Sequence, residues 1–223
     1  MNQTLPKTYT LFHGSRTKVE KPSYGKGNPH NDYGLGFYCT ESKDLACEWA
    51  CPDTQDGYVN EYTLDASGLR FLDLDAVEKP CLRWLTILID NRRFDATTPL
   101  MEEAKGYLLE RFLIDMHEFD VVTGYRADDS YFSFARAFLD NRLSLNQLER
   151  ALRLGELGKQ VVLKSPKAFE ALSFVGAGTV DGAAWHPKRC ARDVRAREEY
   201  RAMVQATGVI KDDLYMIDLL RGA

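Results

Sequence analysis

Two short segments near the start of the chain hold residue types that can bind a ligand. His13-Gly14 follows a run of aromatic and aliphatic residues, and Tyr38 follows a glycine-containing turn. Trp49 stands eleven residues after Tyr38. An imidazole can hydrogen-bond a hydroxyl group, a glycine backbone can approach a ligand closely, and aromatic rings can stack on another ring. These residues are the first candidates for a binding site.

A second polar group follows a predicted strand in the middle of the chain. Segment 120–124 has strand character, and Arg126, Asp128 and Asp129 come shortly after it. A carboxylate can act as a general acid or base, and an arginine can pair with it or with a phosphate. The same carboxylates can instead cap the following helix by accepting hydrogen bonds from its first amides. Both uses remain open.

Hydrophobic periodicity predicts a mixture of strands and helices around these residues. The strands are expected at 9–12, around Tyr38, and at 57–64, 69–74, 120–124 and 160–164. The helices are expected after a cap at Thr40 or Ser42 and before Pro52, and at 82–89, 104–116, 145–154 and 191–206. A turn at Ser67-Gly68 separates the third and fourth strands, which favours a hairpin.

The order of these elements predicts an α+β domain with a C-terminal appendage. The composition loosens from Gly176 to Pro187, and the helix at 191–206 is highly charged with a narrow apolar stripe. We therefore expect a domain at residues 1–178 and a helical extension at 179–223. The extension is a candidate surface for a partner protein.

Composition and charge exclude several classes of protein. The chain has 223 residues, of which 44% are hydrophobic, and a formal charge of −4 without a basic stripe. It is therefore expected to be folded, and nothing indicates broad electrostatic binding to nucleic acid. Its five cysteines form no C-x-x-C pair, which favours free thiols in a reducing compartment and argues against a metal site. No segment resembles a signal peptide or a membrane span, so we expect a cytoplasmic protein.

The motifs resemble those of ADP-ribosyltransferases, particularly the poly(ADP-ribose) polymerase branch. That branch has a strand with His-Gly, a Gly-x-Gly-aromatic-Tyr strand, and a second aromatic residue eleven positions later. Residues 8–174 also resemble a family of uncharacterised bacterial domains placed among ADP-ribosyltransferase-like folds. The matching segments are 13–15, 32–38, 48–50, 124–132 and 157–162. The resemblance implies an ADP-ribosyltransferase-like split β-sheet core with surrounding helices.

The resemblance also implies that NAD is the substrate. His13 would hydrogen-bond a ribose hydroxyl on the adenosine side, and the Gly14 backbone would hold the nicotinamide carboxamide. Tyr38 and Trp49 would sandwich the nicotinamide ring, although Trp49 on an apolar helix face is equally compatible with a core position. The predicted NAD contacts are His13, Gly14, Ser15, Gly36, Tyr38, Trp49 and Arg126.

One position departs from the family pattern. The last strand of the family's site often begins with a glutamate, whereas here it begins with Gln160. Glutamine can position a ribose but cannot act as a carboxylate base, which favours mono-ADP-ribosyl transfer or NAD hydrolysis over polymer formation. A carboxylate would then come from Asp128, Asp129 or Glu61. The predicted catalytic residues are His13, Tyr38, Gln160, Asp128 and Asp129.

The resemblance further implies a biological setting. Members of the bacterial family occur near small partner genes, as in toxin–antitoxin or phage-defence modules. This implies an intracellular effector with an inhibitory partner protein and an acceptor that is a protein, a nucleic acid or a small molecule. Because Gln160 replaces the usual acid, the alternative is a catalytically inactive module that binds a nucleotide or a protein. A cysteine nucleophile, Cys39 or Cys47 with His13 or His30, would need activation that the sequence does not indicate.

Overall fold

The protein is described here by a computed structural model, which covers residues 7–127, 129–154, 158–206 and 213–222. Its strands are β1 (Thr8–Ser15), β2 (Phe37–Cys39), β3 (Gly57–Asp65), β4 (Phe71–Asp73), β5 (Val121–Tyr125), β6 (Lys159–Leu163) and β7 (Leu172–Val180). Its helices are α1 (Lys43–Ala50), α2 (Pro80–Asn91), α3 (Pro99–Phe112), α4 (Asp129–Leu139), α5 (Leu145–Ala151), α6 (Pro166–Glu170), α7 (Gly182–Ala206) and α8 (Met216–Leu220), with a short 3-10 helix at Met116–Glu118.

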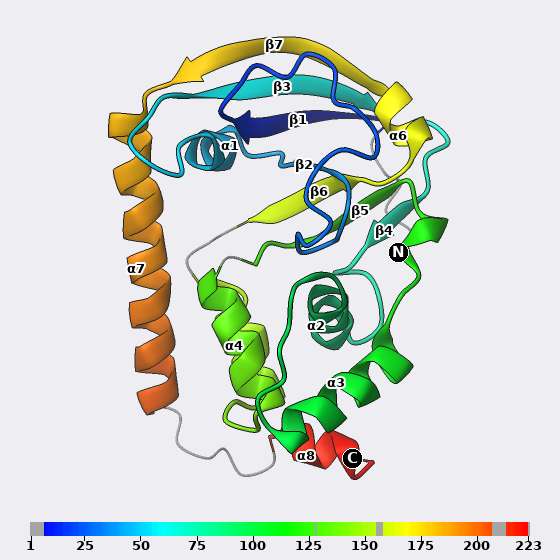
Figure 1. The fold of residues 1–223 in the computed structure, drawn as a ribbon, viewed down its shortest axis with the longest axis vertical. Helices are drawn as coiled ribbons and strands as arrows, with labels where there is room; N and C mark the ends of the chain where they lie inside the picture. The colour runs from blue at the N-terminus through cyan, green and yellow to red at the C-terminus, as the bar shows by residue number, and fades with distance from the viewer. Residues whose placement is uncertain (1–6, 128, 155–157, 207–212, 223) are drawn as a thin grey trace.

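The strands form two sheets that meet along one line. The first has the order β1-β3-β7 and is antiparallel, and the second has the order β2-β6-β5-β4, in which only β4 and β5 are parallel. Phe12 and Thr40 exchange backbone hydrogen bonds of 2.7 and 2.9 Å, which join β1 to the residue after β2. In Figure 1 the three-stranded sheet lies above the four-stranded one. The predicted α+β class is confirmed, whereas the ADP-ribosyltransferase core remains a prediction.

The predicted hairpin of β3 and β4 is wrong. Both long edges of β3 are already occupied, one by β1 and the other by β7. The turn after β3 contains Gly68 in the left-handed region (φ +74°), and the chain then passes into the second sheet. There Phe71–Asp73 pairs in parallel with Val121–Thr123. The predicted turn at Ser67-Gly68 is present, but it connects a strand of the first sheet to a strand of the second.

The main hydrophobic core lies below the four-stranded sheet, where α2 packs against α3 (Figure 1). Pro80 starts α2 with the fixed φ that suits a first helical position, and Trp84 is 1% exposed inside it. The indole Nε1 of Trp84 donates to the Tyr125 carbonyl oxygen over 3.0 Å. This bond ties the end of β5, and therefore the polar segment after it, to a rigid helix.

Helix α1 packs directly on β1 of the first sheet. Its N-cap is Ser42, one of the two predicted caps, and the Ser42 hydroxyl accepts from the Leu45 amide at 3.3 Å. A Cβ atom at Gly14 would lie 1.9 Å from the Ala46 carbonyl oxygen, so only glycine permits this approach. The close packing sets the position of Trp49 relative to His13.

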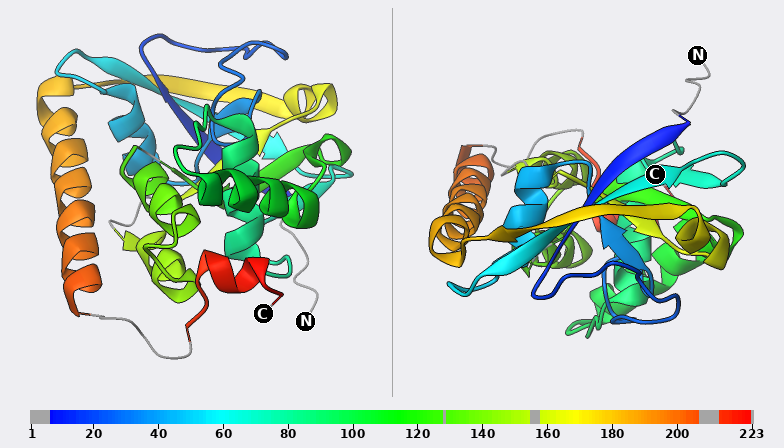
Figure 2. Two further views of the ribbon diagram at one scale, coloured as in Figure 1. Left: turned by 60° about the horizontal axis from the view of Figure 1, so that its bottom comes forward. Right: turned by 90° about the horizontal axis from the view of Figure 1, so that it is seen from above.

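The C-terminal elements pack against the rest of the protein. Helix α7 begins at Gly182, earlier than the predicted Ala191, and continues through Pro187. It lies beside α1 and α4, as the views in Figure 2 show. Its Arg192 forms a buried ion pair with Glu48 of α1. The core also includes Ala196, Met203, Met216 and Leu219 from this part of the chain. The boundary after residue 178, which falls within β7, stays a prediction.

The ion pair between Arg192 and Glu48 allows a test of how firmly α7 is attached. Their side chains are 8% and 11% exposed, so Arg192→Met leaves a buried carboxylate without its partner. We expect the free energy of unfolding to fall by about 3 kcal/mol, measured by urea denaturation. The double variant Glu48→Gln/Arg192→Met should be more stable than Arg192→Met alone, because it removes both charges. Unchanged stability in Arg192→Met would mean that α7 is only loosely docked.

Candidate functional site

A cavity of about 330 Å³ opens where the two sheets meet. Strands β1, β2 and β6, helix α1 and the loops before β2 and after β5 contribute to its wall. The lining residues are His13, Gly14, Asn31, Asp32, Tyr38, Trp49, Arg92, Arg126, Ala127 and Gln160. Six of them were predicted as site residues, and they come from five separate segments of the chain.

His13 is held at the junction of the sheets. Its Nδ1 lies 2.7 Å from the Tyr38 carbonyl oxygen, and its ring packs against Phe37 with centroids 4.5 Å apart. A carbonyl oxygen only accepts hydrogen bonds, so Nδ1 carries the proton and Nε2 is left as an acceptor. Burial lowers the pKa of His13, whereas the bond to Tyr38 opposes this shift. The imidazole is therefore a neutral acceptor near pH 7.

Tyr38 is fixed by the glycine turn that precedes it. Gly34 has a φ of +69°, which favours glycine, and its carbonyl oxygen accepts the Tyr38 hydroxyl over 2.5 Å. The same hydroxyl accepts from the Tyr33 amide at 3.1 Å. Because the hydroxyl is used inside the turn, the Tyr38 ring is the part that remains available to a ligand.

Lys164 holds the other side of this turn. Its Nζ donates to the carbonyl oxygens of Tyr33 and Leu35, at 2.5 and 2.8 Å. Burial lowers the pKa of Lys164 to about 8. The turn that presents Tyr38 is thus fastened to the end of β6, the strand that carries Gln160.

Trp49 lies at the cavity and is only half-buried. The Arg126 guanidinium lies over the Trp49 ring, 5.2 Å from its centroid, a cation–π geometry. The indole Nε1 is buried and has no hydrogen-bond partner among the residues that the structure describes. The position is therefore that of a cavity wall, and Arg126 covers part of the surface on which a ring would stack.

Gln160 lies deep in the cavity beside a carboxylate that the sequence analysis did not assign. Gln160 is 6% exposed and Asp32 is 5% exposed. The Gln160 Nε2 donates to Asp32 Oδ2 over 3.2 Å, and Arg92 Nε pairs with Asp32 Oδ1 at 3.0 Å. Asp32 is the first residue of the matching segment 32–38, and this position is the signal by which the sequence could have identified it. Arg92 is the residue directly after α2, and no motif in the sequence marked it as a site residue.

The remaining predicted site residues lie elsewhere. The Ser15 hydroxyl donates to the Thr17 carbonyl oxygen over 2.6 Å, and Ser15 is not in the cavity wall. Gly36 packs on β6 and lines two neighbouring cavities instead. Glu61 lies within β3 and does not line the cavity.

Two predicted carboxylates cannot be placed in the site. Asp128 lies outside the described residues, and Asp129 is the first residue of α4 with a side chain that is not described. The two uses proposed for them, acid or helix cap, therefore both stay predictions.

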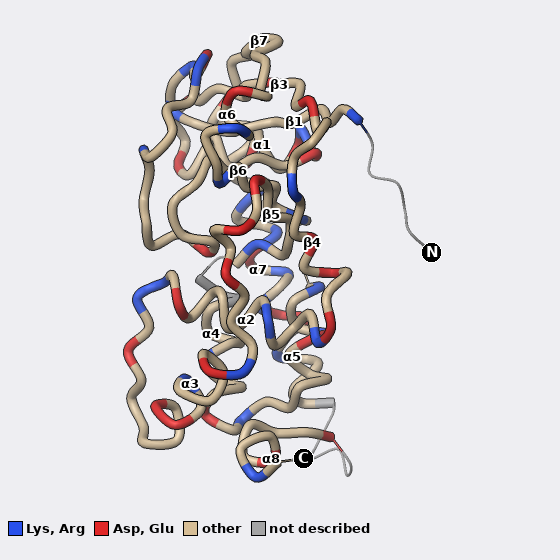
Figure 3. The backbone as a smooth tube through the Cα atoms, turned by 90° about the vertical axis from the view of Figure 1, so that its right-hand side faces the viewer, with Lys and Arg blue, Asp and Glu red and all other residues tan. Residues whose placement is uncertain are grey.

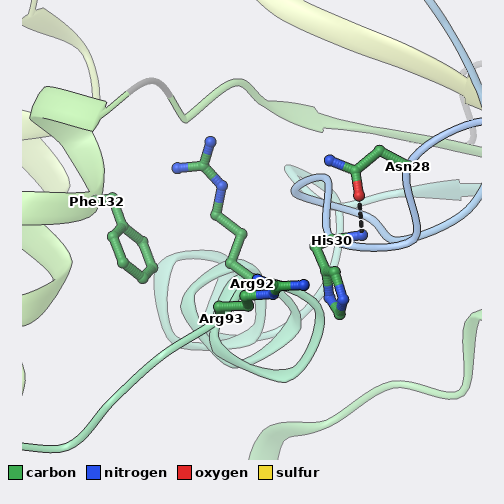
Figure 4. Close-up of a pocket in the computed structure, with 5 residues that line it drawn as sticks. All are labelled: Asn28, His30, Arg92, Arg93 and Phe132. Atoms are coloured by element: carbon green, nitrogen blue, oxygen red, sulfur yellow. Dashed lines mark hydrogen bonds between the residues drawn. The ribbon is translucent and has the colours of Figure 1, made fainter.

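Two further hollows adjoin the cavity. One, of about 330 Å³, shares His13, Asn31 and Tyr38 with it and extends along the loop that contains Pro22 and Lys26. The other, of about 480 Å³, shares Arg92. Its wall is formed by Arg92 and Arg93 at the end of α2, Phe132 of α4, and Asn28 and His30 of the loop before β2 (Figure 4). The cavity therefore continues toward one polar loop and one basic rim.

Charge elsewhere on the chain is mixed. Figure 3 shows basic and acidic residues interspersed along the tube. The described residues contain no group of three or more His, Cys, Asp or Glu side chains that could hold a metal ion. Among the same residues, no helix has both the length and the apolar character required to cross a bilayer.

All five cysteines are free, and only Cys190 is exposed. Burial raises the pKa of the Cys39 and Cys47 thiols. A raised pKa lowers the thiolate fraction, which disfavours either cysteine as a nucleophile.

Comparison with known proteins places the chain in one family. The model of the family described as "Protein of unknown function (DUF3990)" matches residues 9–174, and the chain belongs to this family. Searches among curated proteins and among solved structures each found no match. The matched segment begins in β1 and ends within β7, so it contains every residue that lines the cavity.

The burial of His13 predicts its titration. We expect its protonation midpoint, followed by NMR of the ring, to lie below the ordinary histidine value of about 6.5. Below about pH 6.5 the unfolded chain binds a proton at this histidine more readily than the folded chain does. The free energy of unfolding therefore falls as the pH falls from about 6.5 toward the lowered pKa of the folded state. The resonance is assigned with His13→Gln. A midpoint at or above the ordinary value would show that the ring is solvated.

Proposed function

We propose that the protein is an NAD-dependent mono-ADP-ribosyltransferase that transfers ADP-ribose to an acceptor and releases nicotinamide. One observation carries the proposal: six residues that the resemblance assigns to the NAD site line a single cavity between two mostly antiparallel sheets. They are His13, Gly14, Tyr38, Trp49, Arg126 and Gln160. Residues selected for ligand chemistry would not be expected to converge if their patterns were accidental.

The cavity suits the nicotinamide half of NAD. The rings of Tyr38 and Trp49 offer stacking surfaces, each worth about 0.5 to 1.5 kcal/mol beyond burial. The Gly14 backbone can hydrogen-bond the carboxamide, and the His13 Nε2 acceptor can take a ribose hydroxyl. The adjoining hollow that shares His13 and Tyr38 then receives the adenosine half.

The reaction breaks one bond and forms another at the same carbon. The bond between C1 of the nicotinamide ribose and the ring nitrogen breaks, and its electron pair stays with nicotinamide. A lone pair of the acceptor forms the new bond to C1, and the proton of the acceptor leaves to solvent. The ribose carries positive charge in between, which Asp32 and the Gln160 carbonyl stabilise from the cavity wall. Water in place of the acceptor gives NAD hydrolysis.

The acceptor is a protein or a nucleic acid, and an inhibitory partner protein controls the enzyme. The basic rim formed by Arg92 and Arg93 lies where an acceptor would approach. The second candidate function is a catalytically inactive module that binds a nucleotide or a protein partner. It is favoured by the identity of Gln160, because an amide cannot remove a proton from the acceptor.

Release of nicotinamide from NAD by the purified protein tests the proposal. We expect measurable release by the wild type and a loss of at least about 100-fold in His13→Ala, because the ribose contact of Nε2 and the Nδ1 bond that joins His13 to Tyr38 are both removed. His117→Ala is the matched control, since His117 lies in the 3-10 helix away from the cavity. Its activity should equal that of the wild type.

The outcomes separate the two candidates. NAD binding without nicotinamide release, measured by calorimetry on the same protein, would favour the inactive module. Equal release by wild type and His13→Ala would remove His13 from the site, and absence of both binding and release would refute the NAD assignment.

The role of the Tyr38 ring has a separate test. Tyr38→Phe keeps the stacking surface but loses two hydrogen bonds to the turn, whereas Tyr38→Leu loses the ring as well. We expect nicotinamide release to fall less than about 10-fold in Tyr38→Phe and at least about 100-fold in Tyr38→Leu. Thermal unfolding of both variants controls for damage to the turn. Equal losses in the two variants would show that the hydroxyl matters more than the ring.

A further inference from the structure

Asp32 is the only carboxylate among the described residues that line the cavity. It is 5% exposed, and both of its oxygens have partners. Oδ1 forms an ion pair with Arg92 Nε at 3.0 Å, and Oδ2 accepts hydrogen bonds from the Ala127 amide at 2.8 Å and from Gln160 Nε2 at 3.2 Å. Burial raises the pKa of Asp32, and these three donors oppose the rise. Because the three donors converge on its two oxygens, the side chain is held in one orientation with both oxygens used as acceptors.

The carboxylate determines which way the Gln160 amide faces. Asp32 pairs with Arg92 and accepts from the Ala127 amide, so it acts as an acceptor and the NH₂ group of Gln160 points at it. The carbonyl oxygen Oε1 is then turned away from it. Oε1 is buried and has no hydrogen-bond partner among the described residues. A buried acceptor left without a donor is destabilising, because nothing offsets the loss of its hydration. Such a cost at a cavity wall indicates a site for a donor on a ligand.

We propose that Asp32 is a positioning residue, which orients Gln160 so that its Oε1 accepts a hydroxyl group of the bound substrate. The inference rests on the proposed function, and the hydroxyl is then one on the nicotinamide ribose. Asp32 acts through Gln160 and through the charge that it places in the wall. The pair divides between two residues what a single glutamate would supply: an oxygen acceptor at the substrate and a negative charge behind it.

The arrangement also explains the use of glutamine at this position. A glutamate in place of Gln160 would put a second carboxylate about 3.2 Å from Asp32. Two carboxylates at that separation cannot both ionise, so they would share one proton with a raised pKa. Arg92 and Arg126 lie near Asp32 and oppose this rise, but His13, being neutral, does not. An amide avoids the conflict because it donates to Asp32 at every pH.

Gln160→Glu therefore has a distinctive pH profile. When the pair holds one proton, the protonated carboxyl group of the substituted side chain donates to Asp32 and still offers its other oxygen to the substrate, as the amide does. As pH rises through the raised pKa of the pair, the second carboxylate ionises and repels the first. We expect the ratio of nicotinamide release by Gln160→Glu to that by the wild type to fall at least about 10-fold from about pH 5.5 to about pH 8.5. The ratio corrects for effects common to both proteins, such as the titration of His13.

The charge-swapped variant provides the matched control. In Asp32→Asn/Gln160→Glu a single carboxylate remains beside Arg92 and Arg126, so the repulsion is absent. We expect its activity ratio to be flat with pH and to exceed that of Gln160→Glu at the alkaline end of the range. Asp120→Asn is a control for loss of a buried carboxylate elsewhere: Asp120 is 6% exposed and accepts from Ser165 at the far end of β6. It should change stability without changing the pH profile.

Thermal unfolding of the same proteins tests the coupling without any substrate. We expect Gln160→Glu to lose stability relative to the wild type as pH rises, and the charge-swapped variant to recover part of the loss. If the wild type releases no nicotinamide but the unfolding profiles follow this pattern, the proposed function fails and the orientation of Gln160 by Asp32 stands. A flat unfolding profile for Gln160→Glu overturns the positioning role, whatever the activity of the wild type. So does an activity ratio for Gln160→Glu that does not depend on pH.

Discussion

The architecture of the site depends on the short contact between the two sheets. Phe12 and Thr40 exchange backbone hydrogen bonds, and the next residue of β1, His13, donates from its ring to the Tyr38 carbonyl oxygen. β1 and β2 are thus joined by backbone and side-chain bonds within three residues. His13 and Tyr38 lie in different sheets, and this contact fixes their positions relative to each other. The cavity lies beside this contact and is lined by residues of both sheets.

Several residues that line the cavity combine a packing role with a proposed ligand contact. Gly14 lacks a side chain because α1 occupies that space, and the same absence leaves its backbone at the cavity. Tyr38 uses its hydroxyl to close the turn and leaves its ring to the cavity. Asp32 neutralises Arg92 and also orients Gln160. Substitutions at these positions are therefore expected to change stability as well as the proposed ligand contacts, and variants that keep the shape of the side chain separate the two effects best.

The sequence predicted local structure well where the signal was local. The cap at Ser42, the alternation in β3 and the β-branched run of β6 each depend on a few adjacent residues. The pairing of β4 with β5 was missed because strand periodicity does not reveal which strand is the neighbour. Strand β7 was missed in part because Gly176 and Gly178 are poor strand formers. Its conformation is imposed by antiparallel pairing with β3.

In the candidate site, too, the sequence revealed local patterns but not the contacts between distant residues. His13, Tyr38 and Trp49 were recognised from their spacing, and the fold places them together. The link between Asp32 and Arg92 was invisible, because it joins positions 60 residues apart through tertiary packing alone. Gln160 was noted as a departure from a pattern, but only the structure shows the carboxylate that it faces.

The central claim is that the cavity between the sheets holds the nicotinamide end of NAD. A crystal structure of the protein with nicotinamide tests it most directly. The account predicts the ring against Tyr38 and Trp49, with its carboxamide hydrogen-bonded to the Gly14 backbone and Arg126 displaced from the tryptophan face. Nicotinamide bound elsewhere, or an unoccupied cavity at saturating nicotinamide, would contradict it.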